Sequence, residues 1–240
     1  MLEDFVMKPN EDLSYECANC SHPGSESCPL NIESKTAFSD SKKNTLIKKG
    51  DVIFKENGNP TGVYVIYDGK VKISKLGEEG KEQIMRFAKS GDFIGYRSVI
   101  GEETYHATAT ALNDVRLCQI PKEDFYGVLR CNAELMQNLL KILAEDLKNA
   151  EERILSISQK SVKERIAETL ILLHHKFGTK ANESIDVKLS RKDISNIAGA
   201  TIETTIRTLS EFKKHGFIEF DGKQIIVKSI PKLINLANIH

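Results

Sequence analysis

The sequence predicts an α+β protein in which a jelly-roll β-domain, a long helix and a winged helix-turn-helix follow one another along the chain. Three observations support this order. Short β-type segments between glycine turns fill much of the first half, a helix with a sustained apolar seam follows, and two capped helices with a hairpin lie near the end. We expect an N-terminal arm at 1–40, a β-roll at 41–131, the long helix at 132–160 and the winged domain at 161–240.

Length and charge limit the class of protein. A chain of 240 residues suits two domains. The formal net charge is zero, but residues 1–40 carry two lysines against eight acidic residues, whereas residues 161–240 carry thirteen basic against nine acidic residues. The basic C-terminal part fits a polyanionic partner. No apolar run approaches the roughly 18 residues of a membrane-spanning helix and the acidic N-terminus is unlike a signal peptide, so we expect no membrane association and a cytoplasmic location.

The segment from Thr45 to Ile120 has the pattern of short strands between turns. Asp68-Gly69 predicts a two-residue hairpin turn between two of these strands. The regular spacing is typical of a small antiparallel barrel or jelly roll. The candidate strands lie at 46–47, 52–54, 63–67, 71–73 and 84–87.

A long helix is predicted to begin at Asn132, whose side chain suits an N-cap. Its apolar residues recur at alternating intervals of four and three, as the a and d positions of a coiled coil do. Packing against the β-roll of the same chain is the alternative, but so narrow a seam on a charged helix favours pairing with a second copy. The predicted dimer-interface residues are Met136, Leu140, Leu143, Leu147, Ala150, Ile154 and Ile157.

Two short helices joined by a tight turn are predicted between Ser190 and Gly216. Ser190, with Asp193 three residues later, suits the start of the first helix, and Gly199-Ala200 suits the turn. Thr201 is the expected N-cap of the second helix. The residues of that helix spaced to point inward are Thr205, Leu209 and Phe212.

The outward side of the second helix carries side chains suited to DNA. Arg207 can bridge O6 and N7 of guanine, and Glu203 can accept a hydrogen bond from N4 of cytosine. Ile202 and Ile206 suit contact with thymine methyl groups, although burial of both in another core is the alternative. A hairpin predicted around Asp221-Gly222 favours a winged helix-turn-helix, whose second helix enters the major groove. The predicted DNA-binding residues are Thr201, Ile202, Glu203, Thr204, Ile206 and Arg207.

Five cysteines in a chain expected in the cytoplasm, where disulfides are rare, favour a metal-binding or redox role. Three of them, Cys17, Cys20 and Cys28, lie within twelve residues of the arm, which has no helical or strand periodicity. Cys118 lies in the predicted β-roll, and taken alone it would be expected to be a small buried hydrophobe.

The order of the parts and several motifs resemble the CRP/FNR family of bacterial transcription regulators. The most specific motifs are Lys49-Gly50-Asp51, Asp68-Gly69-Lys70-Val71, Gly91-Asp92-Phe93-Ile94-Gly95 and Glu203-Thr204-Thr205-Ile206-Arg207. The resemblance covers nearly the whole chain and implies a cyclic-nucleotide-binding-like β-roll. It also implies a homodimer that binds a palindromic promoter site, with Glu203 and Arg207 on the bases. The implied partners are double-stranded DNA, a second copy and RNA polymerase, and no enzymatic activity is expected.

The cyclic-AMP branch of this family holds its nucleotide with a Gly-Glu pair and an Arg-Ser/Thr pair. The matching positions here are Gly95-Tyr96 and Tyr105-His106, so the acidic and the basic partner are both missing. We therefore do not expect cyclic AMP to be an effector.

The FNR branch resembles the chain better, because it has an N-terminal cysteine cluster and a further cysteine in the β-roll. The resemblance implies a [4Fe–4S] cluster and an oxygen-responsive regulator. Seven residues separate Cys20 from Cys28, where five are usual, and Ile206 stands where serine is frequent. Zinc is the alternative metal, since four thiolates bind it equally well, and His22 could replace one cysteine. The residues matching the family's cluster ligands are Cys17, Cys20, Cys28 and Cys118, the last followed by Ile120-Pro121.

Two other functions fit parts of the sequence. One is a CRP/FNR-type regulator with a small-molecule effector or none, whose cysteines are structural. The other is a redox enzyme or electron carrier that uses the cysteines, although the chain has no G-x-G-x-x-G nucleotide motif.

Overall fold

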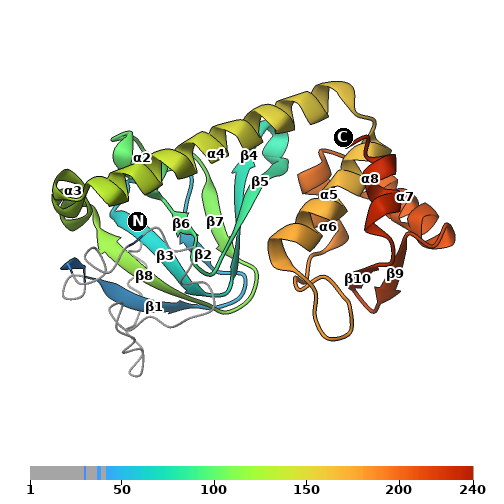
Figure 1. Cartoon of the computed structure of the whole chain (residues 1–240), viewed down its shortest axis with the longest axis horizontal. Helices are drawn as coiled ribbons and strands as arrows, with labels where there is room; N and C mark the ends of the chain where they lie inside the picture. The colour runs from blue at the N-terminus through green and yellow to red at the C-terminus, as the bar shows by residue number, and fades with distance from the viewer. Residues whose placement is uncertain (1–29, 31–36, 39–41, 240) are drawn as a thin grey trace. The chain divides into compact units, whose positions relative to one another are not determined.

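Residues 30, 37–38 and 42–239 are described by a computed structural model of the chain (Figure 1). The chain divides into two compact units, 1–71 with 88–139 and 72–87 with 140–240. The strands are β1 (Lys43–Ile47), β2 (Val52–Phe54), β3 (Gly62–Asp68), β4 (Lys70–Leu76), β5 (Glu82–Lys89), β6 (Phe93–Ile94), β7 (Thr108–Ala111), β8 (Val115–Pro121), β9 (Ile218–Asp221) and β10 (Gln224–Val227). The helices are the 3-10 turn η2 (Glu78–Gly80), α2 (Tyr96–Ile100), α3 (Lys122–Cys131), α4 (Ala133–Gln159), α5 (Val162–Phe177), α6 (Arg191–Ala198), α7 (Ile202–Lys214) and α8 (Ile230–Leu236).

The first eight strands form the predicted β-roll. They make two four-stranded sheets, in the orders β1-β8-β3-β6 and β2-β7-β4-β5. All pairs of the first sheet are antiparallel. The rings of Phe54 on β2 and Tyr64 on β3 stack with their centroids 5.7 Å apart, so they join the two sheets in the core of the roll. The predicted jelly-roll class is therefore confirmed, although the sequence did not predict β6, β7, β8 or α3.

The predicted hairpin at Asp68-Gly69 is wrong. Strand β3 ends at Asp68 and β4 begins at Lys70, but the two strands belong to different sheets. Gly69 has φ +112°, and a Cβ atom there would lie 2.8 Å from the carbonyl oxygen of Asp114 and 2.8 Å from the side chain of Val115. A glycine is thus needed where the chain crosses from one sheet to the other, because Asp114 and Val115 leave no room for a side chain.

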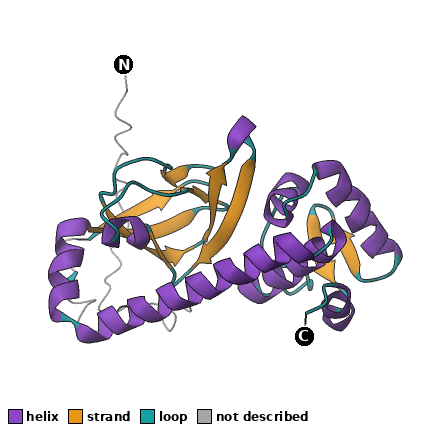
Figure 2. Cartoon of the chain, turned by 90° about the horizontal axis from the view of Figure 1, so that it is seen from above, coloured by secondary structure: helices purple, strands orange, loops and turns teal. Residues whose placement is uncertain are grey.

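Helix α4 is one uninterrupted helix of 27 residues (Figure 2). It begins as predicted, because the side-chain oxygen of Asn132 accepts a hydrogen bond of 2.8 Å from the backbone N–H of Leu135. Leu135 and Leu139 in its first two turns are buried. No helix in the described part of the chain is long and apolar enough to cross a membrane.

The winged domain comprises α5 to α8 with β9 and β10. Ser161 and Ser190 open α5 and α6 with full capping boxes, and Gly199 ends α6 in the left-handed conformation. In the wing Asp221 pairs with Gln224, so the turn falls at Gly222-Lys223, one residue later than predicted.

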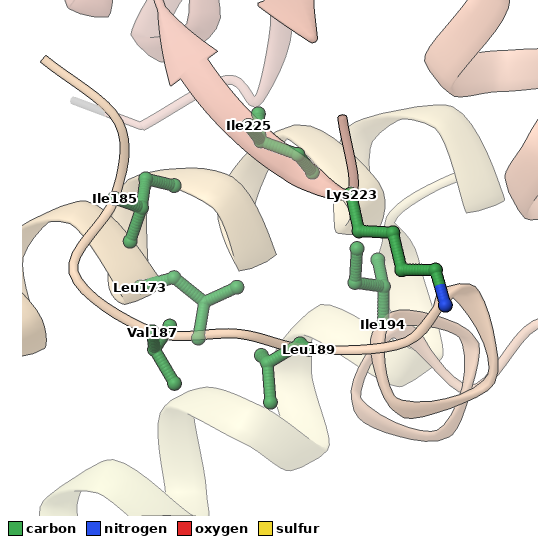
Figure 3. Close-up of a pocket in the computed structure, with 7 residues that line it drawn as sticks. All are labelled: Leu173, Ile185, Val187, Leu189, Ile194, Lys223 and Ile225. Carbon is green, nitrogen blue, oxygen red and sulfur yellow. The ribbon is translucent and has the colours of Figure 1, made fainter. Parts of the chain in front are cut away.

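The core of the winged domain is closely packed. Figure 3 shows the apolar side chains that line a small space in this core, and the amine of Lys223 turned away from them. The space left among them is about 10 Å³, roughly that of one water molecule, so it does not hold a ligand. The apolar lining residues are Leu173, Ile185, Val187, Leu189, Ile194 and Ile225.

Candidate nucleic-acid interface

Helix α7 has one buried and one exposed side, as its spacing predicts. Thr205, Leu209 and Phe212 are buried. Ile202 and Ile206 are 40% and 48% exposed, so the alternative in which both isoleucines lie in a core is wrong for this chain. Glu203 and Arg207 are exposed on the same side. The predicted orientation of the helix is confirmed, and its contacts with DNA stay a prediction.

Threonine hydroxyls organise the first turn of α7. The Thr201 hydroxyl accepts a 3.2 Å hydrogen bond from the backbone N–H of Thr204 and lies 3.0 Å from the Thr204 hydroxyl. The Thr205 hydroxyl donates to the carbonyl of Thr201 at 2.9 Å. The first N–H groups of a helix lack partners within it and carry the positive end of its dipole. Exposed hydroxyl and N–H groups at this end suit contacts with phosphate oxygens.

Two basic side chains lie over the ring of Phe220 on the wing, and neither was among the predicted site residues. The Arg191 guanidinium lies 4.5 Å from the centroid of the Phe220 ring, and the Lys213 amine lies 5.5 Å from it. Burial lowers the pKa of Arg191, which still leaves a guanidinium charged at neutral pH. The signal available in the sequence was Arg191-Lys192 directly after an N-cap serine.

The start of α6 is held by half-buried ion pairs within the second unit. The Lys72 amine on β4 lies 3.1 Å from Asp193 and 2.9 Å from Glu82. The Asn196 side chain donates to Glu82 at 2.9 Å. Burial acts to raise the pKa of Asp193, but hydrogen bonds from Ser190 and the charge of Lys72 together bring it below the usual value. Asp193 is therefore ionised at neutral pH and holds both its capping box and Lys72.

The predicted dimer seam lies on the surface of α4. Leu147 is 60% exposed and Ile154 is 69% exposed, although both are large apolar residues. Leu143 is half-buried. The buried leucines of α4 are Leu135 and Leu139, which are not seam positions. The remaining exposed seam residues are Met136, Leu140, Ala150 and Ile157.

Of the four predicted cluster ligands, Cys17, Cys20 and Cys28 lie outside the described residues. Cys118 on β8 is buried, and its thiol donates a 3.2 Å hydrogen bond to the Asn44 side chain on β1. Among the described residues no three potential ligands gather into a metal site.

The position of Cys118 in the sheet is informative. Cys118 pairs with Val65, the neighbour of Tyr64, and successive residues of a strand point to opposite faces. Because the Tyr64 ring lies inside the roll, Cys118 lies on its outer face. There it adjoins β1, the strand that follows the N-terminal arm. A thiolate at this place, beside the chain that leads from the other three cysteines, fits the donor set of a four-cysteine cluster.

Aromatic side chains stack inside the roll, and one of them is Tyr105, which with Tyr96 matches the nucleotide contacts of the cyclic-AMP branch. The rings of Phe54 and Tyr105 stack with centroids 4.1 Å apart, and the Tyr105 hydroxyl donates to the carbonyl of Gly62 at 3.3 Å. Tyr96 and Tyr105 are both buried, and burial raises the pKa of Tyr105 so that it stays neutral. Neither tyrosine can pair with a phosphate as a guanidinium does.

Together, the β-roll, the long helix and the winged helix-turn-helix define the architecture of a DNA-binding transcription regulator. Residues 45–132 match the family model of the cyclic nucleotide-binding domain, and residues 164–236 match that of the Crp-like helix-turn-helix domain.

Individual proteins give the same result. The chain is 30% identical to the "Fumarate and nitrate reduction regulatory protein" of Vibrio cholerae over 195 residues, which are 80% of this chain and 78% of that protein. It is 29% identical to the "Anaerobic regulatory protein" of Aggregatibacter actinomycetemcomitans over 80% of this chain and 75% of that protein. The solved structure of FixK2 from Bradyrhizobium japonicum is similar with a TM-score of 0.73 and 26% identity, covering 81% of this chain and 96% of that one. The chain belongs to the CRP/FNR family of transcription regulators, which are not enzymes.

Proposed function

We propose that this regulator binds a palindromic promoter site as a homodimer and that α7 contacts the bases of each half-site. The exposed isoleucines of α7 carry this proposal, because two large apolar side chains in water beside a glutamate and an arginine suit a major groove containing thymine methyl groups. The residues we assign to the DNA are Thr201, Ile202, Glu203, Thr204, Ile206 and Arg207. Such a regulator would act with RNA polymerase in the cytoplasm.

The assignment of α7 is tested by substituting Arg207 and measuring competition between duplexes. Arg207→Ala should lose the preference for the cognate half-site and keep weak, salt-sensitive binding, because a good base contact is worth roughly 1–3 kcal/mol of discrimination. Arg207→Lys is the matched control, since it keeps the charge and loses the two-pronged geometry. It should retain the salt dependence and still lose specificity. Full specificity in either variant would place another element in the groove.

We propose that the dimer forms through the seam of α4 defined by Met136, Leu140, Leu143, Leu147, Ala150, Ile154 and Ile157. Two features support this pairing. The seam residues are exposed or half-buried in the single chain. A helix with apolar residues at a and d positions is also stabilised by pairing with a second such helix. Two copies of α7 would then face successive turns of DNA, as a palindromic site requires.

We also propose that Cys17, Cys20, Cys28 and Cys118 hold a [4Fe–4S] cluster that makes DNA binding respond to oxygen. The position of Cys118 on the outer face of the roll beside β1 supports this, and the names of two relatives concern fumarate and nitrate reduction and anaerobic regulation. The cluster would supply reactivity toward oxygen. The protein would supply four thiolates, three from the arm and one from Cys118 on β8.

The cluster proposal is tested with protein purified without air. It should be brown, contain about four iron and four sulfide per chain, and lose both together with DNA affinity on exposure to air. Cys118→Ser should behave like the air-exposed protein. Cys131→Ser, a substitution of an exposed cysteine at the end of α3, is the control and should behave like wild type. Colourless protein containing zinc, or structural cysteines without metal, would contradict the proposal and leave the DNA-binding assignment intact.

Cyclic AMP is not the proposed effector. The support is the stack of Phe54, Tyr64 and Tyr105, which occupies the interior of the roll. Calorimetry with cyclic AMP should show no tight binding.

A further inference from the structure

The side chain of Arg165 on α5 joins three carbonyl groups from two places in the second unit. Its Nη1 donates to the carbonyl of Lys160 at 2.7 Å, in the connection between α4 and α5. Its Nε donates to Ala198 at 2.8 Å, and its Nη2 donates to Gly199 at 3.1 Å. The last two carbonyls lie at the end of α6, where the turn to α7 begins.

The chemistry of these groups suits a rigid connection. A guanidinium is planar, permanently charged and has donors in a fixed fork, so it can hold several carbonyls in one geometry. The last carbonyls of a helix lack partners within the helix and carry the negative end of its dipole. A cation at this end is therefore favoured, and a lysine amine, which is a single compact centre, cannot span the same three oxygens.

A second residue of α5 ties it to the end of α4. Glu168 accepts a hydrogen bond from the Ser156 hydroxyl in the last turns of α4, and it pairs with the Lys160 amine at 3.0 Å. Arg165 and Glu168 lie three residues apart, so they share one side of α5. This side of α5 therefore contacts the end of α4, and through Arg165 it also contacts the turn before α7.

The turn in question determines the direction of α7. Only Ala200 separates Gly199 from Thr201, the N-cap of α7. A connection that fixes the carbonyls of Ala198 and Gly199 relative to Lys160 therefore restricts the angle between α7 and α4.

We propose that Arg165 is a positioning residue that sets the direction of the DNA-contacting helix relative to the dimer helix, and thereby the half-site spacing that the dimer accepts. This inference rests on the proposed dimeric DNA binding. Adding one base pair between half-sites moves the second by about 3.4 Å and turns it by about 35°. A rigid connection between α4 and α7 lowers the affinity for a duplex with altered spacing, whereas a loose connection leaves that affinity almost unchanged.

The test compares duplexes that differ only in spacing. Wild-type full-length protein first selects its half-site and spacing from a random library, and dissociation constants are then measured by fluorescence anisotropy for that spacing and for one base pair more or less. The spacing ratio is the dissociation constant for an altered spacing divided by that for the selected spacing. In Arg165→Lys and Arg165→Gln this ratio should fall about tenfold, equivalent to about 1.4 kcal/mol. The preference for bases within each half-site should be unchanged, because α7 itself is intact.

A matched control lies on the same helix. Lys163 pairs with Glu211 of α7, so Lys163→Gln removes a tie between α5 and α7 and leaves the Lys160 carbonyl bonded to Arg165. It should keep the wild-type spacing ratio. Equal weakening of every spacing by the Arg165 variants, or the same loss of ratio in Lys163→Gln, would overturn the proposal.

Two further outcomes are distinguishable. If Arg165→Gln fails to fold, the spacing ratio of Arg165→Lys, which keeps the positive charge, tests the proposal alone. If wild-type protein is monomeric or binds all spacings alike, the proposed dimeric function itself has failed, and the inference about Arg165 fails with it.

Discussion

Shortening Leu147 to alanine should weaken the dimer strongly, and the size of the effect follows from its exposure. Fully burying a leucine side chain contributes about 1.5–3 kcal/mol. Leu147 is 60% exposed in the single chain, so its burial at a dimer seam is worth about 1–2 kcal/mol per copy. Both copies change at once in a symmetric dimer, which brings the loss to about 2–4 kcal/mol. The dimer dissociation constant should therefore rise roughly 30- to 700-fold.

Sedimentation velocity over nanomolar to micromolar concentrations measures this constant directly. Leu155→Ala is the matched control, because Leu155 lies on the same helix and is 54% exposed but falls outside the a and d positions. It should leave the dimer unchanged. Leu147→Glu should be monomeric at micromolar concentration, since it would place unpaired charges in the interface. A Leu147→Ala constant within threefold of wild type, or equal weakening by Leu155→Ala, would refute the assigned seam.

Two further predictions concern the stability of the single chain. Asp193→Asn should lower the free energy of unfolding near neutral pH, and the difference from wild type should shrink in acid. The reason is that the folded-state pKa of Asp193 lies below 3.8. The ionised carboxylate therefore stabilises the fold fully above that pH, and this stabilisation is lost as pH falls through the folded-state pKa. Urea unfolding from pH 7 to pH 3 measures the difference between variant and wild type, and a difference independent of pH would contradict the prediction. Gly69→Ala should cost more than Gly80→Ala in thermal unfolding, because both glycines have positive φ but only at Gly69 would a Cβ meet neighbours, at 2.8 Å. Equal losses would show that backbone conformation alone accounts for the effect.

Local signals explain why α7, the helix proposed to contact DNA, could be predicted from the sequence. Its N-cap Thr201, its inward residues and its outward isoleucines all follow from helical spacing within thirteen residues. The seam of α4 was predictable for the same reason.

Long-range contacts explain what could not be predicted. Strand β6 has only two residues and β7 only four, so their patterns are too short to recognise. The residues around Asp68-Gly69 have the local pattern of a hairpin, and only the pairing of β3 with β8 and of β4 with the other sheet excludes it. Arg165 gave no signal at all, because an arginine on a charged helix is ordinary until the carbonyls of Ala198 and Gly199 are brought beside it.

Exposed apolar side chains are the feature that links the two proposed contact surfaces. A folded chain gains nothing by leaving Ile206 on α7 or Ile154 on α4 in water. Outside the seam of α4 and the isoleucines of α7, most exposed residues of the two helices are polar or charged, although Leu155 is not. Large apolar side chains that stay exposed on an otherwise polar helix surface of the single chain are expected where another molecule covers them. On α4 these side chains recur at a and d spacing, which suits a second helix. On α7 they alternate with Glu203 and Arg207, which suits the edges of base pairs. The different spacing and neighbours of the exposed residues are therefore our reason for proposing a protein partner on α4 and DNA on α7.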